Sequence, residues 1–219
     1  MTLPTGQQQN DLLIALLAFG ENISGLGGLS SWTLYPTGDT VDGTTGHYLV
    51  YYKIAGSSES APTVTWTTNS KPMFQVSAYR GCDTITPIIN SSGALDTAND
   101  ATISTPTVNN TGSGVEWAVM LSAFRTTTSG NKTNDFTADA ALLERADQNN
   151  SGAGSAAWMS AETADSNGTV TAGNHSYTST VNNGGNSTHK FGALLYIAPA
   201  ASNADFPYQK QPYPNLLQF

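Results

Sequence analysis

The sequence predicts an all-β protein, a two-sheet antiparallel sandwich of the jelly-roll type with an extended C-terminal arm. Short segments in which apolar and polar residues alternate recur along the chain, and this period of two is typical of half-buried strands. The segments between them consist mainly of Gly, Asn, Asp, Ser, Thr and Pro, which favour turns. Thr, Ser, Asn and Gly make up about two-fifths of the chain, and all four are poor helix formers.

The strongest strand predictions begin with Asp11–Phe19, a continuous apolar run that we expect to be covered on both faces. Alternating residues predict further strands at Ser31–Leu34, His47–Ala55, Thr63–Thr67, Phe74–Tyr79, Val115–Phe124 and Phe191–Ile197. In the second of these, Tyr48 and Val50 fall on one face and Leu49 on the other. Because the first and last of these strands are the most apolar, we expect them to lie side by side in the middle of a sheet.

Weaker alternation predicts strands at Thr84–Ile89, Ala101–Thr107, Ala141–Arg145, Ala156–Thr163 and His175–Val181. A short helix near Ala138–Asp147 is the alternative for one of them, because good helix formers cluster there. Turn-forming residues predict loops at Gly25–Ser31, Thr37–Gly46, Gly56–Pro62, Asn90–Asp100, Asn109–Gly114, Thr126–Asn134, Gln148–Gly154 and Asn182–Asn186.

One sandwich domain is expected over residues 1–198, followed by a linker and a C-terminal arm over residues 199–219. Three prolines keep the segment Phe206–Phe219 extended. Its apolar residues are expected to dock onto a neighbouring subunit; they are Phe206, Tyr208, Tyr213, Leu216, Leu217 and Phe219. Two alternatives stay open, namely a strap that lies on its own domain and a disordered tail.

The charge and the cysteine content exclude several classes of protein. Eight basic against sixteen acidic residues give a net charge of −8, which disfavours binding to nucleic acid and to anionic membranes. The single cysteine, Cys82, cannot form a disulfide within the chain and is expected to be buried. The apolar run Leu12–Phe19 is far shorter than the roughly 20 residues of a membrane helix, and no basic residue precedes it. We therefore expect synthesis in a cytoplasm without a secretion signal.

No pattern of residues predicts catalysis, a metal or a cofactor. The three histidines, His47, His175 and His189, belong to no zinc or nucleophile motif, so we expect no enzymatic activity. Acidic residues occur in pairs, which we expect to form turns or solvated charges; the pairs are Asp39 with Asp42, Asp96 with Asp100, and Glu144 with Asp147. Oxygen-rich loops also suit calcium, so a calcium site in the first or second pair is an alternative.

The four tryptophans are the strongest candidates for a sugar-binding platform. Most aromatic residues fall on strand positions that point inward, however, so packing in the core is the expected role of the tryptophans. Trp158 is the least certain of them, because its predicted strand is weak; the others are Trp32, Trp66 and Trp117.

Several segments occur in an order that resembles a known kind of module. They are Asn10–Ala15, Ser31–Trp32, Tyr51–Ala55 followed by Glu59, Thr63–Trp66, Ala78–Asp83 and Pro87–Ile88. Together they resemble the β-sandwich modules of tailed-bacteriophage virion proteins, such as head-decoration (cement) and tail-fibre proteins. The resemblance covers roughly residues 10–198, and the C-terminal arm is not part of it.

The resemblance implies a structural protein on the surface of a bacteriophage virion, made in the cytoplasm of the bacterial host. Its implied partners are other copies of itself, in a homotrimer, and capsid or tail proteins. Separately, the apolar residues of the arm predict that it docks onto a neighbouring subunit or the virion shell. The alternative is a carbohydrate- or receptor-binding module on a tail fibre, with a host surface glycan as its ligand. No catalytic residue, metal or cofactor is implied.

Overall fold

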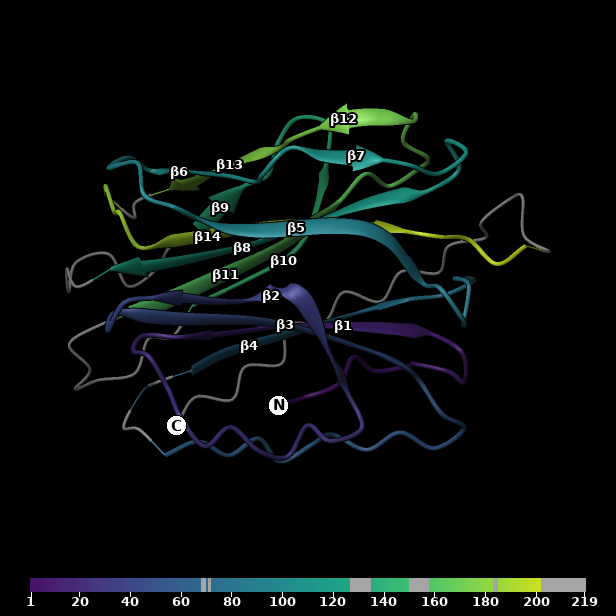
Figure 1. Cartoon of the computed structure of the whole chain (residues 1–219), viewed down its shortest axis with the longest axis horizontal. Coiled ribbons are helices and arrows are strands. Elements are labelled where there is room, and N and C mark those ends of the chain that lie inside the picture. Colours follow the sequence, from purple (N-terminus) through teal and green to yellow (C-terminus); the bar gives the residue numbers. More distant parts are fainter. Residues whose placement is uncertain (68–69, 71, 127–134, 150–157, 183–184, 202–219) are drawn as a thin grey trace.

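The computed structural model describes residues 1–67, 70, 72–126, 135–149, 158–182 and 185–201, and within them the protein is all-β (Figure 1). The first large sheet has the order β2-β3-β1-β4 and consists of β1 (Leu12–Phe19), β2 (Thr33–Asp42), β3 (Gly46–Ile54) and β4 (Pro72–Tyr79). The second has the order β10-β11-β8-β14-β5; its strands are β5 (Ile88–Asp96), β8 (Trp117–Thr126), β10 (Leu143–Asn149), β11 (Trp158–Asp165) and β14 (Lys190–Ile197). Every pairing in both sheets is antiparallel.

The two large sheets pack face to face and enclose the main hydrophobic core, which confirms the predicted sandwich. Alternate residues of β1, such as Leu12, Leu16 and Ala18, contact alternate residues of the second sheet, such as Val119 and Leu195. One side of the sandwich is closed where β2 approaches β5. On the other side the Gln75 side chain of β4 donates a hydrogen bond to the Ala146 carbonyl of β10, with an N–O distance of 2.9 Å.

Covering layers lie on the outer faces of both large sheets, so the molecule has four layers (Figure 1). Loops that carry Ile23, Leu29, Trp32 and Val64 cover the four-stranded sheet. Two small sheets cover the five-stranded one. They consist of β12 (Gly173–His175) paired with β7 (Val108–Asn110), and of β6 (Thr102–Ser104), β13 (Thr178–Asn182) and β9 (Asp135–Thr137) in the order β6-β13-β9.

The prediction that the first and last strands are neighbours is wrong. β1 lies between β3 and β4 in one sheet, whereas β14 lies between β8 and β5 in the other. Every residue of both strands is buried because each strand has the core on one face and a covering layer on the other. The jelly-roll connectivity is not confirmed either, since β1 to β4 all belong to one sheet.

Two predicted loops are largely strand. Thr37–Gly46 contains the second half of β2, and Asn90–Asp100 contains most of β5. Gly38 and Gly93 allow close approach of the backbone, whereas Gly43, with a φ of +55°, lies in the turn between β2 and β3. A Cβ atom added to Gly93 of β5 would lie 2.9 Å from the Thr37 carbonyl oxygen of β2, so a larger residue would push these edge strands apart.

Three predicted elements differ in other ways. Thr63–Thr67 forms a single bridge, between Thr65 and Gly27, because its apolar residues pack in the covering layer instead of a sheet. Ala138–Asp147 is not helical but leads into β10, which pairs with β11 through a bulge. In Thr84–Ile89 only the end is strand, because the Asp83 carboxylate accepts the Ile85 and Thr86 N–H groups and fixes a turn.

Other predictions agree with the structure to within a few residues. The weak strands at Ala101–Thr107, Ala156–Thr163 and His175–Val181 overlap β6, β11 and β13 respectively. Most of the predicted loops Thr126–Asn134 and Gln148–Gly154 lies outside the described residues. The described part of the chain contains no helix that is long and apolar enough to span a membrane.

Candidate functional site

The six predicted docking residues of the arm lie outside the described residues; they are Phe206, Tyr208, Tyr213, Leu216, Leu217 and Phe219. The structure does describe where the chain leaves the sandwich. Pro199 forms a bridge with Cys82, and the Ala200 N–H donates a hydrogen bond of 2.8 Å to the Gly81 carbonyl, directly after β4. The arm therefore starts from a point that is fixed to the end of the four-stranded sheet.

Two of the three histidines pair with the aspartates of the predicted Thr37–Gly46 loop. The His47 Nε2 atom lies 2.8 Å from Asp39, its neighbour on β2, at the surface of the four-stranded sheet. The His189 Nδ1 atom lies 2.6 Å from Asp42 and 3.2 Å from the Thr45 hydroxyl. His189 thus ties the start of β14 in one sheet to the β2–β3 turn of the other.

A histidine beside a carboxylate supplies two of the three members of a catalytic triad. The third is a nucleophile hydrogen-bonded to the second ring nitrogen. The Nδ1 atom of His47 is buried and has no hydrogen-bond partner among the described residues. The third histidine, His175, stacks on Tyr177 and donates from Nε2 to the Thr171 carbonyl. Within the described part of the chain, no three His, Cys, Asp or Glu side chains are placed to hold a metal ion.

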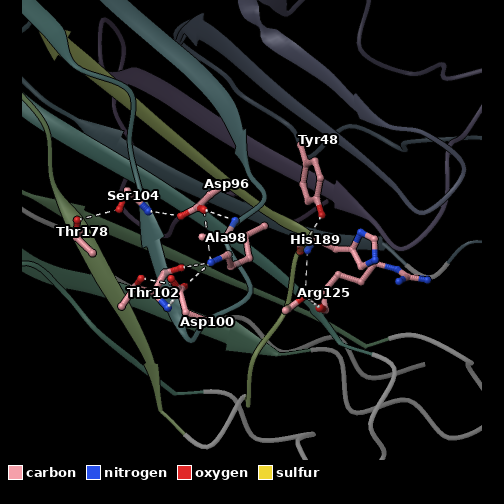
Figure 2. A network of polar contacts seen from close by, with 11 residues as sticks. Tyr48, Asp96, Ala98, Asp100, Thr102, Ser104, Arg125, Thr178 and His189 are labelled. Carbon is pink, nitrogen blue, oxygen red and sulfur yellow. Dashed lines mark hydrogen bonds and ion pairs between the residues drawn. The ribbon is translucent and has the colours of Figure 1, made fainter.

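A network of hydrogen bonds joins Asp96, Asp100, Thr102 and Ser104 in and between β5 and β6 (Figure 2), and a buried lysine of β14 donates to it. The Lys190 side chain is fully buried, and its ammonium group donates to Asp100 at 2.6 Å and to the Thr102 carbonyl at 2.5 Å, with Asp96 at 3.5 Å. The Asp96 carboxylate also accepts the Ser104 N–H. The bond to Lys190 and the backbone N–H of Thr102 lower the pKa of Asp100 to about 2.

This network bears on the calcium alternative for Asp96 and Asp100. Their loop does fold around a cation, as oxygen-rich loops do, but the cation is the ammonium group of Lys190 from β14. A nearby histidine belongs to the same region, because the Tyr48 hydroxyl and the Arg125 N–H both donate to the His189 carbonyl (Figure 2). Each charged side chain described here therefore has a structural role, because its partner lies in another layer or sheet.

Two further sites in the five-stranded sheet bury ionisable side chains. Arg145 makes a bidentate ion pair with Asp165, with both N–O distances at 2.6 Å. Glu162 of β11 is fully buried beneath the covering sheet and accepts a hydrogen bond from the Ser179 hydroxyl of β13. Neither site was predicted from the sequence; the local signal is that a charged residue, Glu162, lies in the middle of β11, but half of that strand is polar.

Cys82 and the tryptophans take the structural roles predicted for them. Cys82 is buried, and this burial raises the pKa of its thiol to about 12, so the reactive thiolate is not formed near neutral pH. Trp32, Trp117 and Trp158 are buried, while Trp66 is half-buried against Phe19 and Phe74. Packing in the core or in a covering layer therefore explains all four rings.

A small hollow, too narrow to hold a water molecule, lies where the edge strands β2 and β5 meet. It is lined by Tyr35, Thr37, Gly38, Val50, Ser91, Ser92, Ala193 and Leu195, without a charged side chain. Since pockets for small ligands are cavities of several hundred Å³, this hollow is a gap in the packing of the sandwich edge.

No known protein family, curated protein or solved structure matches this chain. The resemblance to virion β-sandwich modules therefore stays a prediction from the sequence.

Proposed function

We propose that the chain is a non-catalytic structural protein on the surface of a bacteriophage virion, either a capsid decoration (cement) protein or a tail-associated protein. In this proposal it acts through contacts with other copies of itself, in a homotrimer, and with capsid or tail proteins. The resemblance of residues 10–198 to virion modules supports the class, and the C-terminal arm supports the mode of action.

The observation that carries the proposal is the contrast between the arm and the domain before it. The described domain already has a complete core and two covering layers, and the large hydrophobic residues that it exposes are Val41, Ile85 and Leu143. The arm adds six apolar side chains in a segment that prolines stiffen, which lowers the entropy lost on docking. Burial of each is worth roughly 1.5–3 kcal/mol, so a partner that covers most of them would offset the ordering of the arm.

Deletion of residues 206–219 tests this mode of action. We expect a folded sandwich whose thermal midpoint is little changed, because the described core contains none of the deleted residues, but the truncated chain should be monomeric. Light scattering coupled to size-exclusion chromatography measures the oligomeric state of both chains. Serine at all six apolar positions should have the same effect, whereas Lys210→Ser with Gln211→Ser, a matched change at two polar positions of the arm, should not.

Three results would contradict the proposal. A monomeric full-length chain would refute the homotrimer, and a truncated chain that still forms trimers would show that the arm is a strap or a tail. Loss of the folded state on truncation would place the arm in the core. The alternative function, a glycan-binding module, has less support, because the tryptophan rings that would form a sugar platform are occupied in packing.

A further inference from the structure

Glu162 lies in a row of polar residues that crosses the five-stranded sheet beneath the small sheet β6-β13-β9. It pairs directly with Asp147 of β10 on one side and with Ser122 of β8 on the other, so all three side chains share the outer face. Ser179 of β13 donates to the Oε2 atom of Glu162 from above. This hydrogen bond joins the covering sheet to the large sheet.

The Glu162 carboxyl is fully buried and only partly satisfied. Among the described residues its Oε1 atom has no partner with good hydrogen-bond geometry, and the Ser122 hydroxyl beside it is the nearest donor. An ionised carboxylate accepts only, and burial without enough donors is costly. A protonated carboxyl keeps the Ser179 bond on one oxygen and offers a proton to a neighbouring hydroxyl.

The charges that act on Glu162 from neighbouring strands are acidic. Glu144 and Asp147 of β10 face it, and Asp135 of β9 in turn shares a hydrogen bond with Asp147. The described cations of β10, β8 and β14 have other partners, since Arg145 binds Asp165, Arg125 donates to the Gly20 carbonyl and Lys190 binds Asp100. The neighbours from β8 and β13 are the neutral hydroxyls of Ser122 and Ser179.

Titration of this group follows from its surroundings. Burial raises the pKa of Glu162 to about 7; the acidic groups of Glu144 and Asp147 add to this effect, and the hydroxyls of Ser179 and Ser122 oppose it. Burial likewise raises the pKa of Asp147, and the hydrogen bond from Asp135 adds to it. Because the pKa is higher in the folded state than in water, the contribution of Glu162 to stability is fully present below about pH 4.5 and is lost as the pH rises through about 7.

We propose that Glu162 is a proton-dependent latch between the five-stranded sheet and the covering sheet β6-β13-β9. When its carboxyl is protonated, the bond from Ser179 joins β13 to β11 and no charge is buried between them. When it is ionised, Ser179 still donates to it, but a charge is then buried beside the acidic face of β10, and the covering sheet opens more often. The rest of the sandwich does not depend on the latch, since Glu162 faces away from the main core.

Amide hydrogen exchange of the full chain at pH 5 and pH 8 tests the latch. The Val181 N–H donates to the Ala101 carbonyl at 2.7 Å and so reports on the pairing of β13. Its protection factor, corrected for intrinsic exchange, should fall on the order of 50-fold from pH 5 to pH 8, and at both pH values it should stay below that of the β1 amides, which exchange only when the whole domain opens. In the isosteric variant Glu162→Gln the fall should be less than about threefold, and Asp147→Asn should give an intermediate value.

Another buried glutamate provides a matched control. Glu116 accepts hydrogen bonds from the Ser113, Gly114 and Val115 N–H groups, so Glu116→Gln should leave the pH dependence at Val181 as in the wild type. An equal fall in the wild type and in Glu162→Gln would overturn the latch, as would a protection factor at Val181 equal to that of the β1 amides, because β13 would then open only together with the whole domain. Suppression of the wild-type fall by added Ca²⁺ would also overturn it, since the acidic face would then be a cation site.

Discussion

Replacement of Asp165 by asparagine is expected to lower the free energy of unfolding by about 3–5 kcal/mol. The Arg145 and Asp165 side chains are 5% and 0% exposed, and the guanidinium donates two hydrogen bonds of 2.6 Å to the carboxylate. Asparagine has nearly the same volume but no charge, so the buried guanidinium loses the carboxylate that binds it through two hydrogen bonds. It also weakens the acceptor for the Asn167 N–H. Urea denaturation at neutral pH measures the change.

A double variant separates the cost of an unpaired charge from the value of the pair. Arg145→Met combined with Asp165→Leu removes both charges and fills the space with apolar atoms, so it should recover most of the stability lost in Asp165→Asn. If the free energy of unfolding of Asp165→Asn instead stays within about 1 kcal/mol of the wild type, the guanidinium is hydrated and the pair is not buried in solution.

The core of this protein was predictable from the sequence because a sandwich core imposes a period of two. The faces expected for His47–Ala55 are those observed, with Tyr48 and Val50 in the main core and Leu49 in the covering layer. The same holds for Phe191–Ile197, whose alternate residues from Phe191 all enter the main core. Each strand supplies this signal by itself, without knowledge of its partners.

The edge strands of the sandwich were not predictable, because glycine, serine and threonine occur both in turns and where two strands approach closely. Glycine, serine and threonine in Thr37–Gly46 and Asn90–Asp100 have the composition of a turn. In the fold they allow β2 and β5 to approach closely, as the position of Gly93 beside the Thr37 carbonyl demonstrates. Only the packing of the two sheets decides between these uses, and that information is not local.

The polar contacts were hidden for a related reason. His189 and Asp42 are 147 positions apart, and Lys190 and Asp100 are 90 apart, so each residue is an unremarkable loop or strand-end charge in the sequence. Glu162 carried a local signal, since it is a charged residue in the middle of β11, between Ala161 and Thr163. The docking residues Phe206–Phe219 could be proposed from composition alone, and they lie outside the described residues.

The buried charges and the proposed function fit one physical requirement. A protein that acts by attachment needs a rigid domain from which its arm can start, and here no disulfide within the chain can supply rigidity. Long-range pairs such as His189 with Asp42 instead connect the sheets to each other and to their covering layers. Removal of one of these pairs should therefore lower the free energy of unfolding of the domain, while the docking residues of the arm stay the same.

Substitution of Asp100 by asparagine is expected to destabilise the protein by about 2–3 kcal/mol, more than substitution of its buried partner Lys190 by methionine. The reason is an asymmetry of exposure, since Lys190 is 0% exposed whereas Asp100 is 47% exposed. Without Asp100, the buried ammonium keeps only the more distant Asp96 and the Thr102 carbonyl. Without Lys190, water can reach Asp100, and methionine fills the space of the stem, so the loss should be about 1–2 kcal/mol.

The pH dependence of the two variants distinguishes this explanation from a simple loss of packing. The pKa of Asp100 is lowered to about 2 in the folded state, so the stability that it contributes is present above pH 4 and is lost as the pH falls through about 2. The difference between wild type and Asp100→Asn should therefore be constant between pH 5 and pH 7 and shrink in acid, as followed by urea denaturation at each pH. A difference that persists unchanged at pH 2, or a larger loss in Lys190→Met than in Asp100→Asn, would show that packing around the lysine stem, and not its charge, holds β6 to β14.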